Sequence, residues 1–282
     1  MIKGKKNISD NSSGIQADRD INIKIGLGVE EVKNLTLLYL KENFPKLRED
    51  AIKTAEENVK EFINEFEKKY TQKRKEIDFL KFSDPDIQNS INDATLEIAK
   101  RGRKSNINLL TDLVFEIIKK DNNDLQSLVA AEAIKIVSQL NVGQINHLSI
   151  MVFFEYMSIP NCTNINQYDM SCKHLLPILS KSSTLSGWNL QYLESKKCLI
   201  HQFIGRSNIF SSLSNKNKNL ILNEGQNIEN QIEQTKYFKL FTAQYEKHRM
   251  NYQRLTIIGS LIGAINIKRY LPESIDLKNF IK

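Results

Sequence analysis

Cysteine is scarce in this chain and lacks the spacing of a metal site. The 282 residues include three cysteines, Cys162, Cys172 and Cys198, and no CxxC pair. Disulfide-stapled secreted domains and zinc ribbons both need several paired cysteines, so the sequence excludes both classes. The first residues also lack the apolar core of a secretory signal. We therefore expect a cytoplasmic chain with reduced thiols.

Long apolar runs are missing as well. A membrane-spanning helix needs roughly 20 apolar residues, whereas the best run here, residues 255–267, is interrupted by Ser260 and Asn266. We expect no transmembrane segment. With 40% apolar residues, the chain has enough hydrophobic material for a sizeable core.

Catalytic and metal-binding motifs are also lacking. The histidines form no HxxxH or HExxH pair, so any metal site would have to be assembled by tertiary folding; they are His147, His174, His201 and His248. Cys198 precedes His201 by three residues, which on a helix would bring a thiol near an imidazole, with Glu194 as the nearest orienting acid. The apolar residues between them favour an ordinary core edge. We predict no catalytic residue, no metal and no cofactor.

Positive charge exceeds negative charge, but the two are mixed. Forty Lys and Arg against 33 Asp and Glu give a net charge of +7, interspersed along most of the chain, which favours a solvated surface. The densest basic cluster is Lys100, Arg101, Arg103 and Lys104. It would suit a phosphate backbone, although cations at a helix end also complement the helix dipole, and we favour the dipole interpretation.

Hydrophobic periodicity predicts a mostly α protein, a multi-helix bundle with a short N-terminal β segment and a long amphipathic helix. Three parts are expected: residues 1–27, a β segment for oligomerisation or a tail; residues 28–80, long amphipathic helices kinked near Pro45; and residues 83–282, a helical bundle domain. A cap at Asp84 followed by Pro85 marks the start of the bundle, and Gly102 ends its first helix. The long helix, near residues 47–70, is expected to project as a stalk or to pack in a coiled coil.

The N-terminal segment alternates strictly, with Ile21, Ile23 and Ile25 on one face and Ile15 in a shorter run before them. Two strands this small bury too little apolar surface to be stable alone. The isoleucine face therefore needs a partner, either the helical body or copies of itself from other chains. The alternative is a disordered tail, which the polar composition permits.

Gly259 and Gly263 lie in the interior of the last predicted element, residues 245–270. Each glycine costs a helix roughly 1 kcal/mol relative to alanine. Spaced four apart, they create a smooth face that another helix backbone can approach closely. We predict a close-packed core helix; a membrane-contacting helix is the alternative.

The N-terminal segment resembles a family of bacterial helical proteins of unknown function, in which a segment GDNS-IQAGRDI leads into a helix ending in NF-P-L. The matching residues are Asp10, Asn11, Ser12, Ile15, Gln16, Ala17, Arg19, Asp20, Ile21, Asn43, Phe44, Pro45 and Leu47. Ser9 and Asp18 stand where that pattern has glycine. Similar segments accompany other conflict-system proteins, and the resemblance implies an adaptor or assembly role.

Residues 80–270 are similar to the abortive-infection alpha proteins of bacterial phage defence. The similarity comes from packing patterns in residues 84–88, 109–114, 133–140 and 255–266. It carries over no catalytic residue. It implies a non-catalytic, self-assembling bacterial protein in phage defence, with a homo-oligomer and a phage or host protein as partners. The alternatives are a helical module that binds nucleic acid through the basic cluster and a cryptic nuclease.

Overall fold

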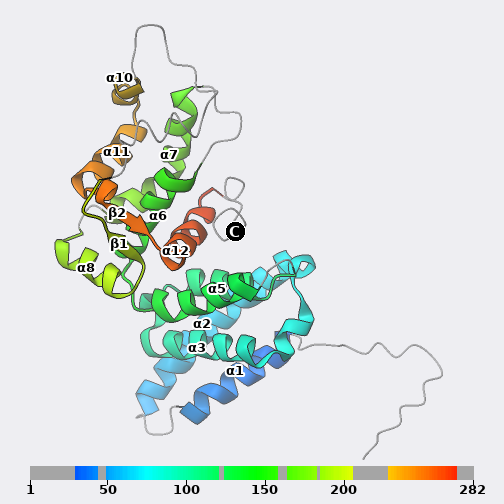
Figure 1. The fold of residues 1–282 in the computed structure, drawn as a ribbon. Helices are drawn as coiled ribbons and strands as arrows, with labels where there is room; N and C mark the ends of the chain where they lie inside the picture. Colours follow the sequence, from blue (N-terminus) through cyan, green and yellow to red (C-terminus); the bar gives the residue numbers. More distant parts are fainter. Residues whose placement is uncertain are drawn as a thin grey trace, which may run out of the picture.

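The computed structural model describes residues 29–43, 49–120, 124–157, 164–182, 185–205 and 228–271. This part of the chain is mostly α, with one two-stranded sheet, which confirms the predicted fold class. In Figure 1 the early helices α1, α2, α3 and α5 stack in the lower half, and α6, α7 and α11 rise above them. The isoleucine segment, residues 1–27, and Pro45 lie outside the described residues.

The first two helices are α1 (Val29–Asn43) and α2 (Glu49–Lys73). The long helix does not project as a stalk, because its apolar stripe packs against α3 and α4. That stripe repeats at helical spacing and is buried at Ala55, Val59, Phe62, Ile63 and Phe66. Two short 3-10 turns follow, η1 (Arg74–Glu76) and η2 (Phe79–Ser83).

Helix α3 (Pro85–Arg101) begins and ends where local chemistry predicts. The Asp84 carboxylate accepts a hydrogen bond from the backbone N–H of Asp86 at 2.8 Å, and Pro85 occupies the first turn. Gly102 ends the helix with a φ of +54°, a conformation that glycine adopts without strain. A 3-10 turn, η3 (Gly102–Ser105), then leads to α4 (Ile107–Ile117) and α5 (Asp124–Val137).

Helices α6 (Val142–Tyr156) and α12 (Ile257–Lys268) are largely buried and pack against each other at the centre of the molecule. Gly263 lies so near α6 that a Cβ there would be 2.7 Å from the carbonyl oxygen of Leu148. A Cβ on Gly259 would overlap the carbonyl oxygen of Cys198. Both glycines are therefore places of close backbone approach. No helix in the described part of the chain is long and apolar enough to cross a membrane.

The remaining elements are α7 (Ile165–Ser182), α8 (Gly187–Ser195), β1 (Leu199–His201), α10 (Ile228–Glu233), α11 (Phe238–Lys247), η4 (Met250–Tyr252) and β2 (Gln253–Leu255). The expectation of one element over residues 245–270 is wrong. Arg249, with a φ of +48°, follows α11, and β2 then pairs antiparallel with β1, Leu199 opposite Leu255. This partner is far away in sequence, so helical periodicity could not reveal it.

One continuous hydrophobic core joins these elements. It contains Val32 and Phe62 from the first two helices together with Ile98, Phe153 and Ile262 from later ones. The core therefore spans the division predicted near residue 82. A smaller cluster beside it holds Leu40, Ala55, Val59, Ile63 and Ala99.

Candidate functional site

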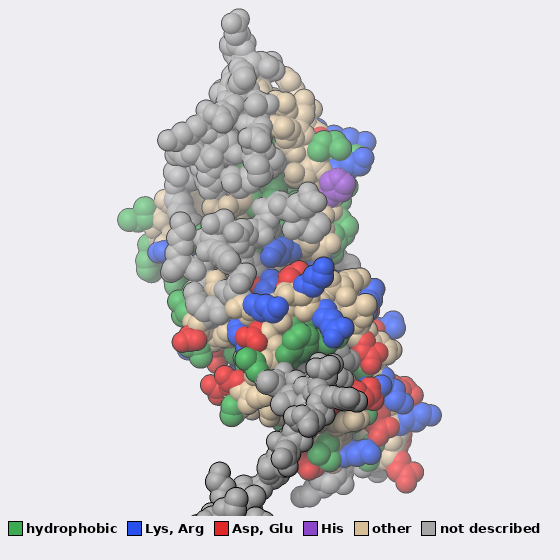
Figure 2. Space-filling view, turned by 90° about the vertical axis from the view of Figure 1, so that its right-hand side faces the viewer, with side chains coloured by type: hydrophobic (Ala, Val, Ile, Leu, Met, Phe, Trp, Pro, Cys, Tyr) green, Lys and Arg blue, Asp and Glu red, His purple; other side chains and the backbone are tan. Residues whose placement is uncertain are grey.

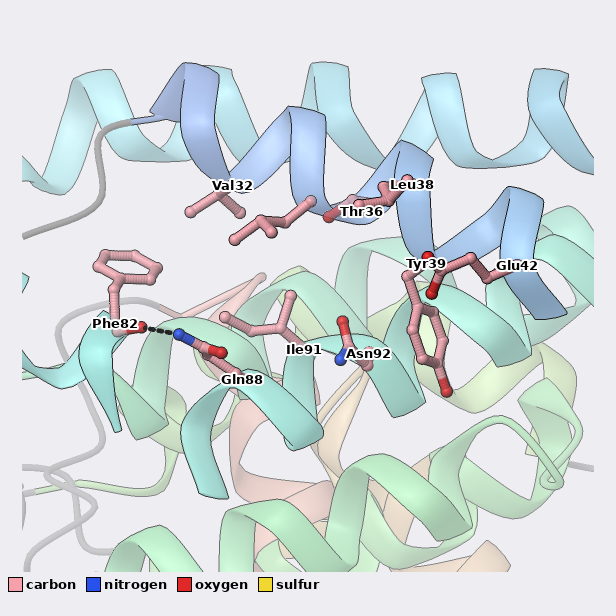
Figure 3. Close-up of a pocket in the computed structure, with 10 residues that line it drawn as sticks. Val32, Thr36, Leu38, Tyr39, Glu42, Phe82, Gln88, Ile91 and Asn92 are labelled. Carbon is pink, nitrogen blue, oxygen red and sulfur yellow. Dashed lines mark hydrogen bonds between the residues drawn. The ribbon is translucent and has the colours of Figure 1, made fainter. Parts of the chain in front are cut away.

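An open apolar groove lies between α1 and α3 (Figure 3). Its cavity volume is about 150 Å³. Leu35 and Leu38 of α1 line it although their side chains are 43% and 53% exposed. Only part of the apolar stripe of α1 is therefore buried, at Val32 and Leu40.

The opposite wall of the groove comes from η2 and α3. Figure 3 shows Val32 on α1 facing this wall, where Phe82 and Ile91 lie. The side-chain amide of Gln88 donates a hydrogen bond to the carbonyl oxygen of Phe82 at 2.8 Å, which ties the start of α3 to the preceding turn. Tyr39, Glu42 and Asn92 line the groove as well and add polar groups. A half-exposed apolar channel with polar groups at its margin is suited to binding a protein segment.

The predicted basic cluster is largely engaged by other protein groups. Lys100 pairs with Glu97 at 3.2 Å, and Nε of Arg103 lies 3.2 Å from Oε1 of Glu61. The guanidinium of Arg101 donates to the carbonyl oxygen of Ser138, just beyond the end of α5. Lys104, the fourth member, is exposed. Lys100 and Arg101 lie in the last turn of α3, where cations complement the helix dipole.

The fold brings two of the four histidines together, which sequence spacing did not predict. The rings of His147 and His248 are 5.6 Å apart between centroids. Burial lowers the pKa of His147 to about 4, and it lowers the pKa of His248 as well. Among the described residues, no group of three or more His, Cys, Asp or Glu side chains could hold a metal ion.

Cys198 and His201 are not on a helix. Cys198 directly precedes β1 and is buried, whereas His201 at the end of that strand is exposed. Burial raises the pKa of the Cys198 thiol to about 12. His201 contacts Glu194 instead, with Nδ1 3.3 Å from Oε2. The thiol is therefore held in its protonated, unreactive form.

Sequence reasoning missed a second concave site, a charged cleft between α2, α4 and α12 with a cavity volume of about 470 Å³. Figure 2 shows Lys and Arg side chains across the middle of one face of the molecule, with Asp and Glu among them. Three separate segments supply the basic residues of the charged cleft, which are Lys68, Lys69, Lys73, Lys119, Lys268 and Arg269. Positions so far apart in sequence leave no local motif.

Comparison with known proteins gives one match. Residues 26–225 match the model of a protein family of unknown function. That range includes the apolar groove and the basic cluster, and it ends before α12. No curated protein matches the chain, and no solved structure does. The resemblance to abortive-infection alpha proteins stays a prediction.

Proposed function

We propose that this is a non-catalytic protein that self-assembles through the groove between α1 and α3. The chain belongs to this family of unknown function, so the proposal rests on its own structure. The isoleucine-bearing segments of neighbouring copies pair with each other and cover the groove. The proposal extends to a role in bacterial phage defence, as the sequence resemblance implies.

The observation that carries the proposal is the exposure of Leu35 and Leu38 beside an open groove. Fully burying one leucine side chain contributes about 1.5–3 kcal/mol. Two half-exposed leucines therefore leave a substantial driving force for a partner that brings its own apolar face.

The predicted isoleucine strand matches this groove in length. Four steps between residues 21 and 25 of an extended strand span about 13 Å. On α1 the groove runs from Val32 to Glu42, and ten helical steps span about 15 Å. Three isoleucines on one face of such a strand would therefore reach along most of the groove.

Backbone hydrogen bonding favours a second copy over the chain's own segment. A lone strand laid into a helical groove would leave its backbone N–H and C=O groups without partners on both edges. Two strands from neighbouring copies satisfy one another along one edge and present isoleucines to the groove. The occupant we propose is therefore the paired segment of a second copy.

The test is a native mass measurement in solution. The full chain should form an oligomer, whereas a chain lacking residues 1–27 and the variant Leu38→Glu should both shift toward the monomer. Leu128→Glu is the matched control, because Leu128 is 62% exposed on α5, away from the groove. It should leave the oligomer intact.

Equal monomeric masses for the full and shortened chains would contradict self-assembly. A full chain that is monomeric, but whose residues 15–25 resist protease until Leu38→Glu is introduced, would show that the segment covers its own groove. The defence role is tested by phage challenge of cells that carry the full gene or the version lacking residues 1–27. Equal plaque counts in cells with and without the full gene would contradict it.

The nucleic-acid alternative has less support. Three of the four basic residues proposed for it already contact Glu97, Glu61 and the Ser138 carbonyl. A phosphate backbone would have to displace these groups. Binding that persists when Arg101 and Arg103 are both changed to alanine would exclude this cluster as the contact.

A further inference from the structure

The charged cleft between α2, α4 and α12 is unlike an ordinary surface hollow. Small-molecule sites are mostly apolar with a few polar groups. Among the residues that line this cleft, Ile265 is apolar and nearly all the others are charged or polar. A ligand that fits such a lining is itself highly charged.

The sign of that ligand follows from the charges in the cleft. Four acids line it alongside the six cations, which leaves two positive charges in excess; the acids are Glu65, Glu76, Asp112 and Glu116. The two most buried acids are already neutralised. Asp112 contacts Lys69 and lies 4.0 Å from Nε of Arg269, and Oε1 of Glu116 lies 2.6 Å from Nζ of Lys119.

Helix α2 supplies three of the six cations and one of the four acids, Glu65. Lys68 and Lys73 form no ion pair with a carboxylate among the described residues of the chain, and both line the charged cleft. Lys69 lies between them in sequence and is only 21% exposed at its side chain. Helix α2 therefore contributes three closely spaced cations to the charged cleft.

Like charges crowd around Lys69. Burial first, and then the charges of Lys73 and Arg269, lower the pKa of its ammonium group to about 8, against the raising effect of Glu65 and Glu116. Holding three cations near one another costs free energy that an entering anion would offset. The charged cleft is therefore built to gain stability from a negatively charged ligand.

We propose that the charged cleft binds a small molecule that carries two or more phosphate groups. Lys68, Lys73 and Arg269 contact the phosphates, and Asp112 keeps Arg269 and Lys69 in place. Arginine offers a planar fork of donors to phosphate oxygens, and lysine adds compact point charges. Because α2, α4 and α12 all contribute to the cleft, the ligand also clamps α12 to the first helices.

The size of the charged cleft favours a compact ligand over a nucleic acid duplex. Its cavity volume of about 470 Å³ lies within the roughly 300–1,000 Å³ that is typical of small-molecule sites. A duplex is contacted over an extended surface, whereas this cleft is a local hollow lined mainly by residues of three helices.

The test is calorimetric titration of the full chain with inorganic tripolyphosphate, at low salt and at physiological salt. We expect saturable binding at one site per chain that weakens as salt is added. The double variant Lys68→Ala/Lys73→Ala should weaken binding by about tenfold or more, because it removes two charge-assisted contacts. Arg269→Gln should weaken tripolyphosphate binding as well, and it tests the wall of the cleft next to α12.

The matched control is Lys53→Ala/Lys60→Ala. It removes the same charge from exposed positions on the same helix, outside the cleft. We expect its affinity to stay within about twofold of the unchanged chain, because only screened, distant charge is lost. Thermal unfolding of the unchanged chain and of both double variants checks that they fold, and tripolyphosphate should raise the melting temperature of the unchanged chain and the control.

Three outcomes would overturn the proposal. One is a titration at low salt that shows no saturable heat of binding for tripolyphosphate. Another is equal weakening by the cleft variant and its control, which would mean diffuse attraction to a positive surface. The third is tight binding of a single-stranded oligonucleotide that the Lys68→Ala/Lys73→Ala variant loses and that saturating tripolyphosphate does not displace. Competition between ATP and tripolyphosphate for one site would support the proposal, and tighter binding of ATP would add that the nucleoside is recognised.

Discussion

Nε2 of His147 lies 2.7 Å from Oε1 of Gln253, which joins the core of α6 to strand β2. The amide nitrogen of Gln253 in turn donates to the carbonyl oxygen of His248 at 2.7 Å, and this fixes the orientation of the amide. The amide oxygen must therefore face His147, so Nε2 of His147 carries the proton and donates it. This hydrogen bond assigns the proton to Nε2, and burial of the ring favours the neutral imidazole.

We predict that the protein loses stability as the pH falls from 6.5 to 4. In the unfolded chain His147 binds a proton below about pH 6.5. In the folded chain burial, the largest cause, lowers its pKa to about 4, and the charges of His248 and His201 lower it further against the raising effect of the Gln253 hydrogen bond. Over this window the unfolded state binds the extra proton, so stability falls with pH by about 3 kcal/mol in total. Urea unfolding at a series of pH values measures this slope.

Two variants isolate the contribution of His147. His147→Gln should be less stable at pH 7 yet should flatten the slope between pH 4 and 6.5. His174→Gln is the control, because His174 is exposed on α7, and it should retain the slope of the unchanged chain. An unchanged slope in His147→Gln would contradict a buried neutral imidazole at this position.

A second prediction concerns the two glycines at helix starts, Gly259 and Gly187. A Cβ on Gly259 would overlap the carbonyl oxygen of Cys198, which accepts a hydrogen bond from the Thr256 N–H at 3.1 Å and cannot easily move. Gly259→Ala should therefore cost about 3 kcal/mol, a typical cost of forced overpacking. A Cβ on Gly187 would meet nothing within 4 Å. Gly187→Ala should raise stability by about 0.5 kcal/mol, by restricting the unfolded chain.

Thermal unfolding of both alanine variants measures the difference between them. Equal stability of the two variants would mean that α12 can move away from the start of β1 without loss of stability. A large loss in Gly187→Ala alone would contradict the packing described for both positions.

The third prediction compares two acids that pair with lysines. Asp112 is 15% exposed at its side chain and contacts both Lys69 and Arg269. Asp112→Asn leaves two cations near each other without their counter-charge and should cost about 2–4 kcal/mol. Glu132, by contrast, pairs with Lys135 at 3.0 Å on the surface, with side chains about half exposed. Glu132→Gln should cost less than about 1 kcal/mol.

Chemical unfolding of the two variants in low and high salt provides the measurement. The cost of Asp112→Asn should persist in high salt, because partly buried charges are screened less than exposed ones. Similar small costs for both variants would show that the cations in the charged cleft are solvated and need no neutralisation.

Local chemistry in the sequence predicted the parts of the fold whose causes are local. The cap at Asp84, the stop at Gly102 and the buried stripe of α2 each follow from residues within one or two helical turns. The close approach at Gly259 and Gly263 could likewise be predicted from their spacing, because small residues in a helix interior need a packing reason.

Features that join distant segments could not be predicted in this way. The strands β1 and β2 are three residues each, too short to show an alternating pattern, and they pair only because the fold brings them together. The charged cleft combines Lys69 of α2 with Asp112 of α4 and Arg269 beyond α12. Each of these residues alone looks like an ordinary surface charge in a lysine-rich sequence.

The last prediction separates folding from docking at the apolar groove. Val32 is 8% exposed and belongs to the core, whereas Leu38, which lines the same groove, is 53% exposed. In a chain lacking residues 1–27, Leu38→Glu should change stability by no more than about 0.5 kcal/mol, as surface substitutions usually do. In the same chain Val32→Glu should cost about 3 kcal/mol or more, because it buries a carboxylate. In the full chain Leu38→Glu should become costly as well, since it would oppose the isoleucine face. Urea unfolding of the four combinations measures this, and an equal, small effect of Leu38→Glu in both chains would show that residues 1–27 do not cover the groove.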